Sequence, residues 1–125
     1  MGWIGAGLRV RPPSSGYEGP TSGEHDTHWF IRFGKGWLHI VNGYAWHSGL
    51  PLESLLKTST SLKVRGWEFG GSMVGLDLAG QLSDGRRWRW FGAPIAEAIS
   101  YENATPVEAE FFDRILDSVC VHSEK

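Results

Sequence analysis

Glu97 is a carboxylate set among apolar residues. It lies between Ile95 and Ile99, and Tyr101 follows two residues after Ile99. If this segment is a strand, all four side chains point to one face. A carboxylate on such a face is poorly hydrated, so it either has a partner or keeps its proton. Because perturbed carboxylates recur at functional sites, Glu97 is a candidate for ligand contact or for acid–base chemistry.

Large aromatic rings form the second part of the candidate site. The chain has 7 Trp and 6 Phe in 125 residues. Such rings fill protein cores, and they also form stacking surfaces for ligands. The predicted ligand-binding residues are Glu97, Trp88, Trp90, Tyr101, Trp46 and His39. Glu97, His39 and Asp77 are the candidate acids or bases, although Arg87 or Arg89 could simply pair with Asp77.

Four potential metal ligands, Glu24, His25, Asp26 and His28, lie close together in the sequence. Histidine and carboxylate suit zinc and other transition metals. Their spacing matches no standard metal motif, so we assign no metal site and leave open whether these four residues bind a metal. The sequence contains no complete phosphate-binding loop and no dinucleotide fingerprint, so we predict no cofactor.

Arg86, Arg87 and Arg89 interleave with Trp88 and Trp90. In some proteins such a strand contacts phosphates and stacks bases. Strand alternation, however, places Arg87 and Arg89 on one face and the two tryptophans on the other, which is typical of a half-buried strand. The formal net charge is −2 and the pI is near 6.2. We therefore expect no nucleic-acid partner.

The apolar runs of the chain are too short to span a bilayer, so no membrane partner is expected. No n-region, apolar h-region and cleavage site come in order at the start of the sequence, which argues against a signal peptide. The single cysteine, Cys120, excludes a disulfide within the chain and fits a reducing compartment. These features predict a cytoplasmic protein.

The sequence predicts an irregular N-terminal arm over residues 1–26 and a single domain over residues 27–125. Residues 12–23 are almost all turn or linker types. Residues 1–23 show no periodic apolar pattern, so we expect them to be dispensable for folding.

Two hairpins are predicted from alternating patterns. In residues 27–42, a Lys35-Gly36 loop would place Phe33 opposite Leu38 and Ile31 opposite Ile40. In residues 73–92, a three-residue loop with Gly85 in the left-handed conformation would place Trp90 opposite Leu78. A two-residue loop there would instead bring arginine to the leucine face, so we choose the three-residue loop.

Further elements complete the expected fold. Residues 51–56 suggest a short helix with Pro51 at its start, and residues 61–69 suggest a strand. Residues 95–102 suggest another strand, although their alanines would also fit a helix. The Thr105-Pro106-Val107-Glu108 segment is typical of a capping box, and the apolar stripe that follows predicts a C-terminal helix.

The sequence therefore predicts an α+β fold. We expect a curved antiparallel β-sheet of five or six strands, a C-terminal α-helix packed on one face, and a short helix between strands. A curved sheet with a helix often leaves an aromatic-lined pocket, so the leading hypothesis is a non-catalytic protein that binds a small molecule. The alternatives are a small enzyme that uses Glu97 or a histidine as acid or base, and an interaction protein that forms a homo-oligomer.

Overall fold

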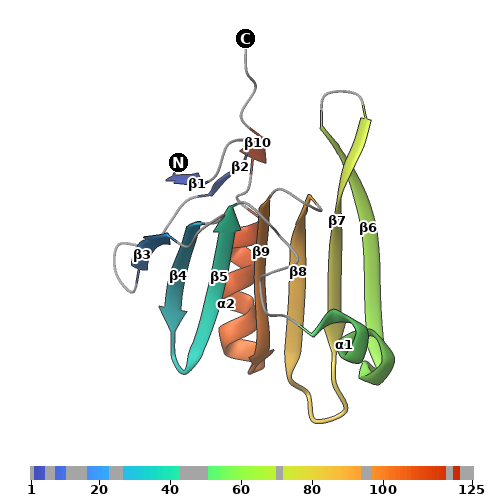
Figure 1. Cartoon of the computed structure of the whole chain (residues 1–125). Helices are drawn as coiled ribbons and strands as arrows, with labels where there is room; N and C mark the ends of the chain where they lie inside the picture. Colours follow the sequence, from blue (N-terminus) through green and yellow to red (C-terminus); the bar gives the residue numbers. More distant parts are fainter. Residues whose placement is uncertain are drawn as a thin grey trace.

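The computed structural model describes residues 2–4, 8–10, 17–22, 27–42, 51–69, 72–93, 97–117 and 120–121. Most strands join one antiparallel sheet. Figure 1 shows these strands side by side, together with the two helices. In spatial order the sheet contains β3 (Tyr17–Ser22), β4 (Thr27–Phe33), β5 (Gly36–Asn42), β9 (Glu97–Ala104), β8 (Arg87–Ala93), β7 (Ser72–Gln81) and β6 (Ser61–Phe69).

The predicted fold class is confirmed. The segment from residue 27 onwards supplies six antiparallel strands, β4 to β9, in an open sheet. Helix α1 (Leu52–Thr58) lies between β5 and β6 in the chain, and helix α2 (Pro106–Leu116) follows β9. No helix in the described ranges is long and apolar enough to cross a membrane.

The segment predicted as an irregular arm contains three strands. β3 extends the main sheet by pairing with β4, with Tyr17 opposite Ile31 and Ser22 opposite Thr27. β1 (Gly2–Ile4) and β2 (Leu8–Val10) form a second sheet with β10 (Cys120–Val121). Over these strands the expectation of irregular structure is wrong, because backbone pairing supplies order that the turn-rich composition does not suggest. The domain boundary near residue 26 stays a prediction.

The hairpin of β7 and β8 has the predicted register. Leu78 lies opposite Trp90, and Gly85 has a φ of 89° in the connecting loop. The β4–β5 hairpin keeps the predicted faces but not the predicted pairs, because its loop is Gly34-Lys35 and Ile31 lies opposite Leu38. Gly34 takes a φ of 63°, as the first central residue of a type II′ turn does.

The strand predicted over residues 95–102 is shifted, and β9 begins at Glu97 and ends at Ala104. The helical alternative is wrong over that range. Ile95 lies outside the described residues. Directly after β9, Thr105 caps α2: its side chain accepts from the Glu108 N–H, and the Glu108 carboxylate accepts from the Thr105 N–H, so the predicted capping box is confirmed.

The two faces of the sheet carry separate apolar clusters. α2 covers one face, which we call the α2 face, where its apolar stripe packs on strands β4, β5, β8 and β9. The buried residues of this cluster include Ile31, Leu38, Ile99, Phe112 and Leu116. The opposite face, the α1 face, carries a smaller cluster of Val41, Leu55, Leu78, Trp88, Trp90 and Ala98. Strands β5, β8 and β9 therefore each send side chains to both clusters.

Candidate functional site

Two of the predicted ligand-binding rings, Trp88 and Trp90, lie in the core of the α1 face. Their exposed fractions are 0% and 6%. The Trp88 indole N–H donates to Ser59 Oγ at 2.8 Å, next to the end of α1. A Cβ at Gly80 would meet the Trp88 Nε1 atom at 2.5 Å, so the indole lies directly over that glycine. In this arrangement the two rings serve packing, and their surfaces are already covered.

Tyr101 lies on the other side of the sheet, in the α2-face cluster, and is 3% exposed. Its hydroxyl donates to the Asp113 carboxylate at 2.8 Å. Burial, followed by the charge of Asp113 and the hydrogen bond to it, raises the pKa of the Tyr101 hydroxyl well above its ordinary value. The sheet thus separates Tyr101 from Trp88 and Trp90.

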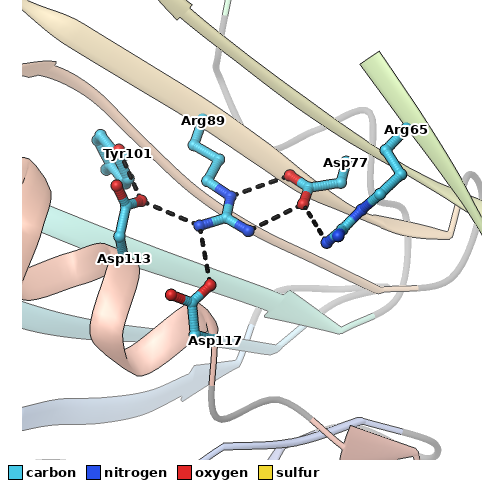
Figure 2. A network of polar contacts seen from close by, with 6 residues as sticks. All are labelled: Arg65, Asp77, Arg89, Tyr101, Asp113 and Asp117. Carbon is cyan, nitrogen blue, oxygen red and sulfur yellow. Dashed lines mark hydrogen bonds and ion pairs between the residues drawn. The ribbon is translucent and has the colours of Figure 1, made fainter. Parts of the chain in front are cut away.

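A polar network begins at Tyr101 and links α2 to strands β8, β7 and β6 (Figure 2). Arg89 binds both oxygens of Asp77, with Nε to Oδ1 at 2.9 Å and Nη2 to Oδ2 at 2.8 Å. The same guanidinium reaches Asp113 at 3.0 Å and Asp117 at 3.5 Å on α2. Arg65 adds a contact to Asp77 at 3.0 Å.

The network disfavours the expected acid–base role of Asp77. This side chain is 8% exposed, and guanidinium groups occupy both of its oxygens. Burial acts to lower the pKa of Arg89, but the hydrogen bond and charge of Asp77, then those of Asp113, outweigh it and hold that pKa above its ordinary value. The guanidinium of Arg89 holds Asp77 through both oxygens, so this carboxylate is not available to a substrate. The arrangement therefore fixes α2 against β7 and β8.

His39 lies on the α1 face at the other end of the sheet, among side chains that are only partly covered. Phe30 stacks on its ring, with centroids 4.7 Å apart and planes 6° apart. Trp37 meets Phe30 edge to face at 5.6 Å, and the Arg32 guanidinium lies 4.3 Å from the centre of the Trp37 ring. With His28, these residues form a continuous series, which we call the aromatic row: His28, His39, Phe30, Trp37 and Arg32.

A hydrogen bond joins the two histidines of the aromatic row. His28 Nδ1 and His39 Nε2 are 2.7 Å apart, and the two ring planes differ by 7°. A hydrogen bond between ring nitrogens lies in the plane of both rings, so the imidazoles meet edge to edge. One nitrogen must donate and the other must accept.

The β4–β5 hairpin positions the aromatic row. Phe30 lies directly opposite His39, and Arg32 lies opposite Trp37. Paired residues of an antiparallel ladder share a face, and alternation brings His28 to that face as well. The three other row side chains are half-buried, whereas Trp37 is 38% exposed and Arg32 is exposed.

The remaining candidates are only partly described. Glu97 begins β9, opposite Asn42 and Ala93, but its side chain lies outside the described residues, as does all of Trp46. Glu24, His25 and Asp26 also lie outside them. Within the described ranges, no group of three or more His, Cys, Asp or Glu side chains is placed to hold a metal ion.

Sequence reasoning identified His39 but missed its partners. Phe30, Trp37 and Arg32 lie in the predicted hairpin of residues 27–42, but the alternating pattern gives them no binding role. A signal is present in the sequence, because the predicted Lys35-Gly36 loop places Arg32 opposite His39 on one face. Comparison of the chain with protein-family models, with curated proteins and with solved structures finds no match.

Proposed function

We propose that this chain is a non-catalytic binding protein that takes a small planar anion, such as an aromatic carboxylate, at the aromatic row. The observation that carries this proposal is the continuous contact of three kinds of group: π-rings, imidazoles and a guanidinium. On the same face, Trp88 and Trp90 are buried, so among the side chains that the structure describes there, the aromatic row offers rings to solvent. A reducing, cytoplasmic location remains part of the proposal.

The chemistry of the row favours an anion over a neutral ligand. Arg32 carries a fixed charge, and its planar guanidinium suits bidentate contact with a carboxylate. Ring edges are the positive part of an aromatic quadrupole, and imidazole N–H groups donate hydrogen bonds. The flat ring of a ligand can pack against the Trp37 ring, while the carboxylate of the ligand contacts Arg32.

A second candidate function is an acid–base enzyme that works through His39. The hydrogen bond between His28 and His39 favours it, because a joined imidazole pair can pass a proton from one ring to the other. This candidate requires turnover of a bound substrate. Loss of activity in His39→Gln, with ligand binding retained, would support it over simple binding.

The binding proposal is tested by titration with 2-naphthoate and with its uncharged amide, 2-naphthamide. The readouts are the indole N–H signal of Trp37 and the imidazole signals of His28 and His39 in NMR spectra. We expect naphthoate to shift these signals and to bind more tightly than the amide. Trp37→Leu should weaken binding by about two- to tenfold, the range for one aromatic contact.

Variants separate charge from fold. Arg32→Gln should remove the preference for naphthoate over naphthamide, while Lys57→Gln, which changes an exposed cation on α1, should leave it unchanged. Equal binding of the two probes by the unmodified protein would contradict the anion preference. Shifts confined to residues outside the aromatic row would contradict the site.

A further inference from the structure

Strand β6 ends the main sheet on the side away from β3 (Figure 1). It pairs with β7 along its whole length, from Ser61 opposite Gln81 to Phe69 opposite Ser72. Within the described part of the chain, no strand pairs with its other edge. Residues 61–66 are all exposed. Every second backbone N–H and C=O of this stretch therefore points away from β7, in the arrangement that receives an added strand.

The side chains of this edge alternate between two types. Leu62 and Val64 lie on the α1 face and are 44% and 63% exposed. Lys63 and Arg65 lie on the opposite face, and the Arg65 side chain is 71% exposed. One face of the edge is thus apolar and the other is cationic, over four consecutive residues.

Lys63 carries the charge of the edge that has no counterion in the described part of the chain. Arg65 contacts Asp77 within the Arg89 network, but its side chain is 71% exposed and can reach a second carboxylate. Lysine on an edge strand also discourages pairing with an identical strand, because like charges would meet across the new ladder.

We propose that β6 binds an extended peptide segment of another protein, in which apolar and acidic residues alternate. The segment adds a strand to the sheet over residues 61–66. Its apolar side chains contact Leu62 and Val64, and its acidic side chains contact Lys63 and Arg65. Backbone hydrogen bonds supply affinity in this mode of recognition, and the alternating side chains supply specificity. The partner is a different chain, since a second copy would bring Lys63 and Arg65 against their own equivalents.

The probe is a capped hexapeptide in which glutamate and valine alternate. Two matched peptides accompany it: one has lysine in place of each glutamate, and the other carries N-methyl groups at alternate valines. Binding is measured by titration, and the β6 amide signals are followed by NMR. We expect the glutamate peptide to shift signals of residues 61–66, the lysine peptide to bind far more weakly, and the N-methylated peptide not to bind, since it cannot complete the ladder.

Substitutions at Lys63 test the charge. Lys63→Glu should weaken binding of the glutamate peptide by about fivefold, which is the effect of about one cross-strand ion pair. The same substitution should strengthen binding of the lysine peptide. Lys57→Gln on α1 serves as the control for loss of a distant cation. Thermal unfolding of each variant shows that the fold is kept, as expected for exposed side chains.

Three results would overturn the proposal. The first is the absence of binding by any peptide at millimolar concentration. The second is equal binding of the glutamate and N-methylated peptides, which would show that no strand is added. The third is dimerisation of the protein through β6, detected by sedimentation and by the same NMR signals, which would assign this edge to a second copy.

Discussion

At the scale of single residues, Asp77 shows how exposure decides the worth of an ion pair. Two arginines bind the same carboxylate at similar distances, 2.8 Å for Arg89 and 3.0 Å for Arg65. The Arg89 side chain is 11% exposed, whereas that of Arg65 is 71% exposed. Water screens the Arg65–Asp77 pair and can replace its contacts, whereas the Arg89–Asp77 pair is largely shielded from water.

The two arginine variants should therefore differ strongly in stability. Arg89→Met removes the bidentate partner of a buried carboxylate and should lower the free energy of unfolding by about 3–5 kcal/mol. Arg65→Met should lower it by no more than about 1 kcal/mol. Urea denaturation followed by circular dichroism measures both. Equal losses would show that the network is as exposed at Arg89 as at Arg65.

Glu108 is a second residue with a measurable consequence, this time in pH dependence. Hydrogen bonds from the backbone N–H of Lys35, at 2.9 Å, and of Thr105, at 3.1 Å, lower the pKa of this carboxyl below its ordinary value of 4.5. The folded protein thus binds this proton less readily than the unfolded chain. The stabilisation is complete above the ordinary pKa and is lost as the pH falls through the lowered one.

Glu108→Gln should remove this part of the pH dependence. The difference in free energy of unfolding between the unmodified protein and the variant should be largest at neutral pH and should shrink below pH 4.5. Urea denaturation at a series of pH values measures it. Glu110→Gln, on an exposed position of the same helix, is the control and should keep the original profile. A constant difference at all pH values would contradict the role assigned to the Glu108 charge.

At the scale of elements, the two hairpins show what a sequence pattern can and cannot determine. In the β7–β8 hairpin, the competing loop would have moved arginines to the leucine face, so the pattern selected one register. In the β4–β5 hairpin, the predicted and observed registers both keep Ile31, Phe33 and Leu38 on one face. Alternation cannot separate them, because the pairing differs by an even number of positions.

The β4–β5 turn, whose register alternation leaves undetermined, contacts a residue that is distant in the sequence. The Glu108 carboxylate of α2 accepts from the Lys35 N–H inside the β4–β5 turn. The sequence predicts both the turn and the capping box, but not that they meet. The aromatic row depends on the same register, since it places Phe30, not Arg32, opposite His39. This explains why His39 was predicted and its stacking partner was not.

Two glycines with positive φ should respond differently to alanine. At Gly85, a Cβ would meet nothing within 4 Å, so Gly85→Ala should cost only the left-handed strain, about 1–2 kcal/mol. At Gly34, a Cβ would lie 2.6 Å from Glu108 Oε2, so Gly34→Ala adds a clash to the strain of its own positive φ and should cost more. Urea denaturation compares them. A larger loss at Gly85 would show that the Gly34 turn does not contact α2.

At the scale of the whole molecule, the sheet explains why the predicted site residues do not come together. The sequence identified half-buried strands correctly, but it could not show which helix covers which face. Trp88 and Trp90 lie on the α1 face, and Tyr101 lies under α2. A set of rings chosen for their chemistry was thus divided between two cores. Of the predicted ligand-binding residues whose side chains are described, His39 alone lies where rings remain partly exposed.

Residues 1–23 were expected to be dispensable for folding, but they include β3 of the main sheet. We therefore expect different results for deletions that end before β3 and after it. Deletion of residues 1–16 removes β1 and β2 but leaves the main sheet complete, so stability and oligomeric state should change little. Deletion of residues 1–23 also removes β3 and uncovers the edge of β4. Its four paired positions, at roughly 0.2–1 kcal/mol each, predict a loss of about 1–4 kcal/mol.

The uncovered β4 edge gives this test a second readout. Unpaired N–H and C=O groups on a strand edge promote pairing between chains, so the longer deletion should self-associate while the shorter one does not. Urea denaturation gives the stability of both proteins, and light scattering after size-exclusion chromatography gives their mass at two concentrations. Identical behaviour of the two deletions would show that β3 does not protect β4. Unfolding of the shorter deletion would show instead that the small sheet of β1, β2 and β10 is required by the rest of the fold.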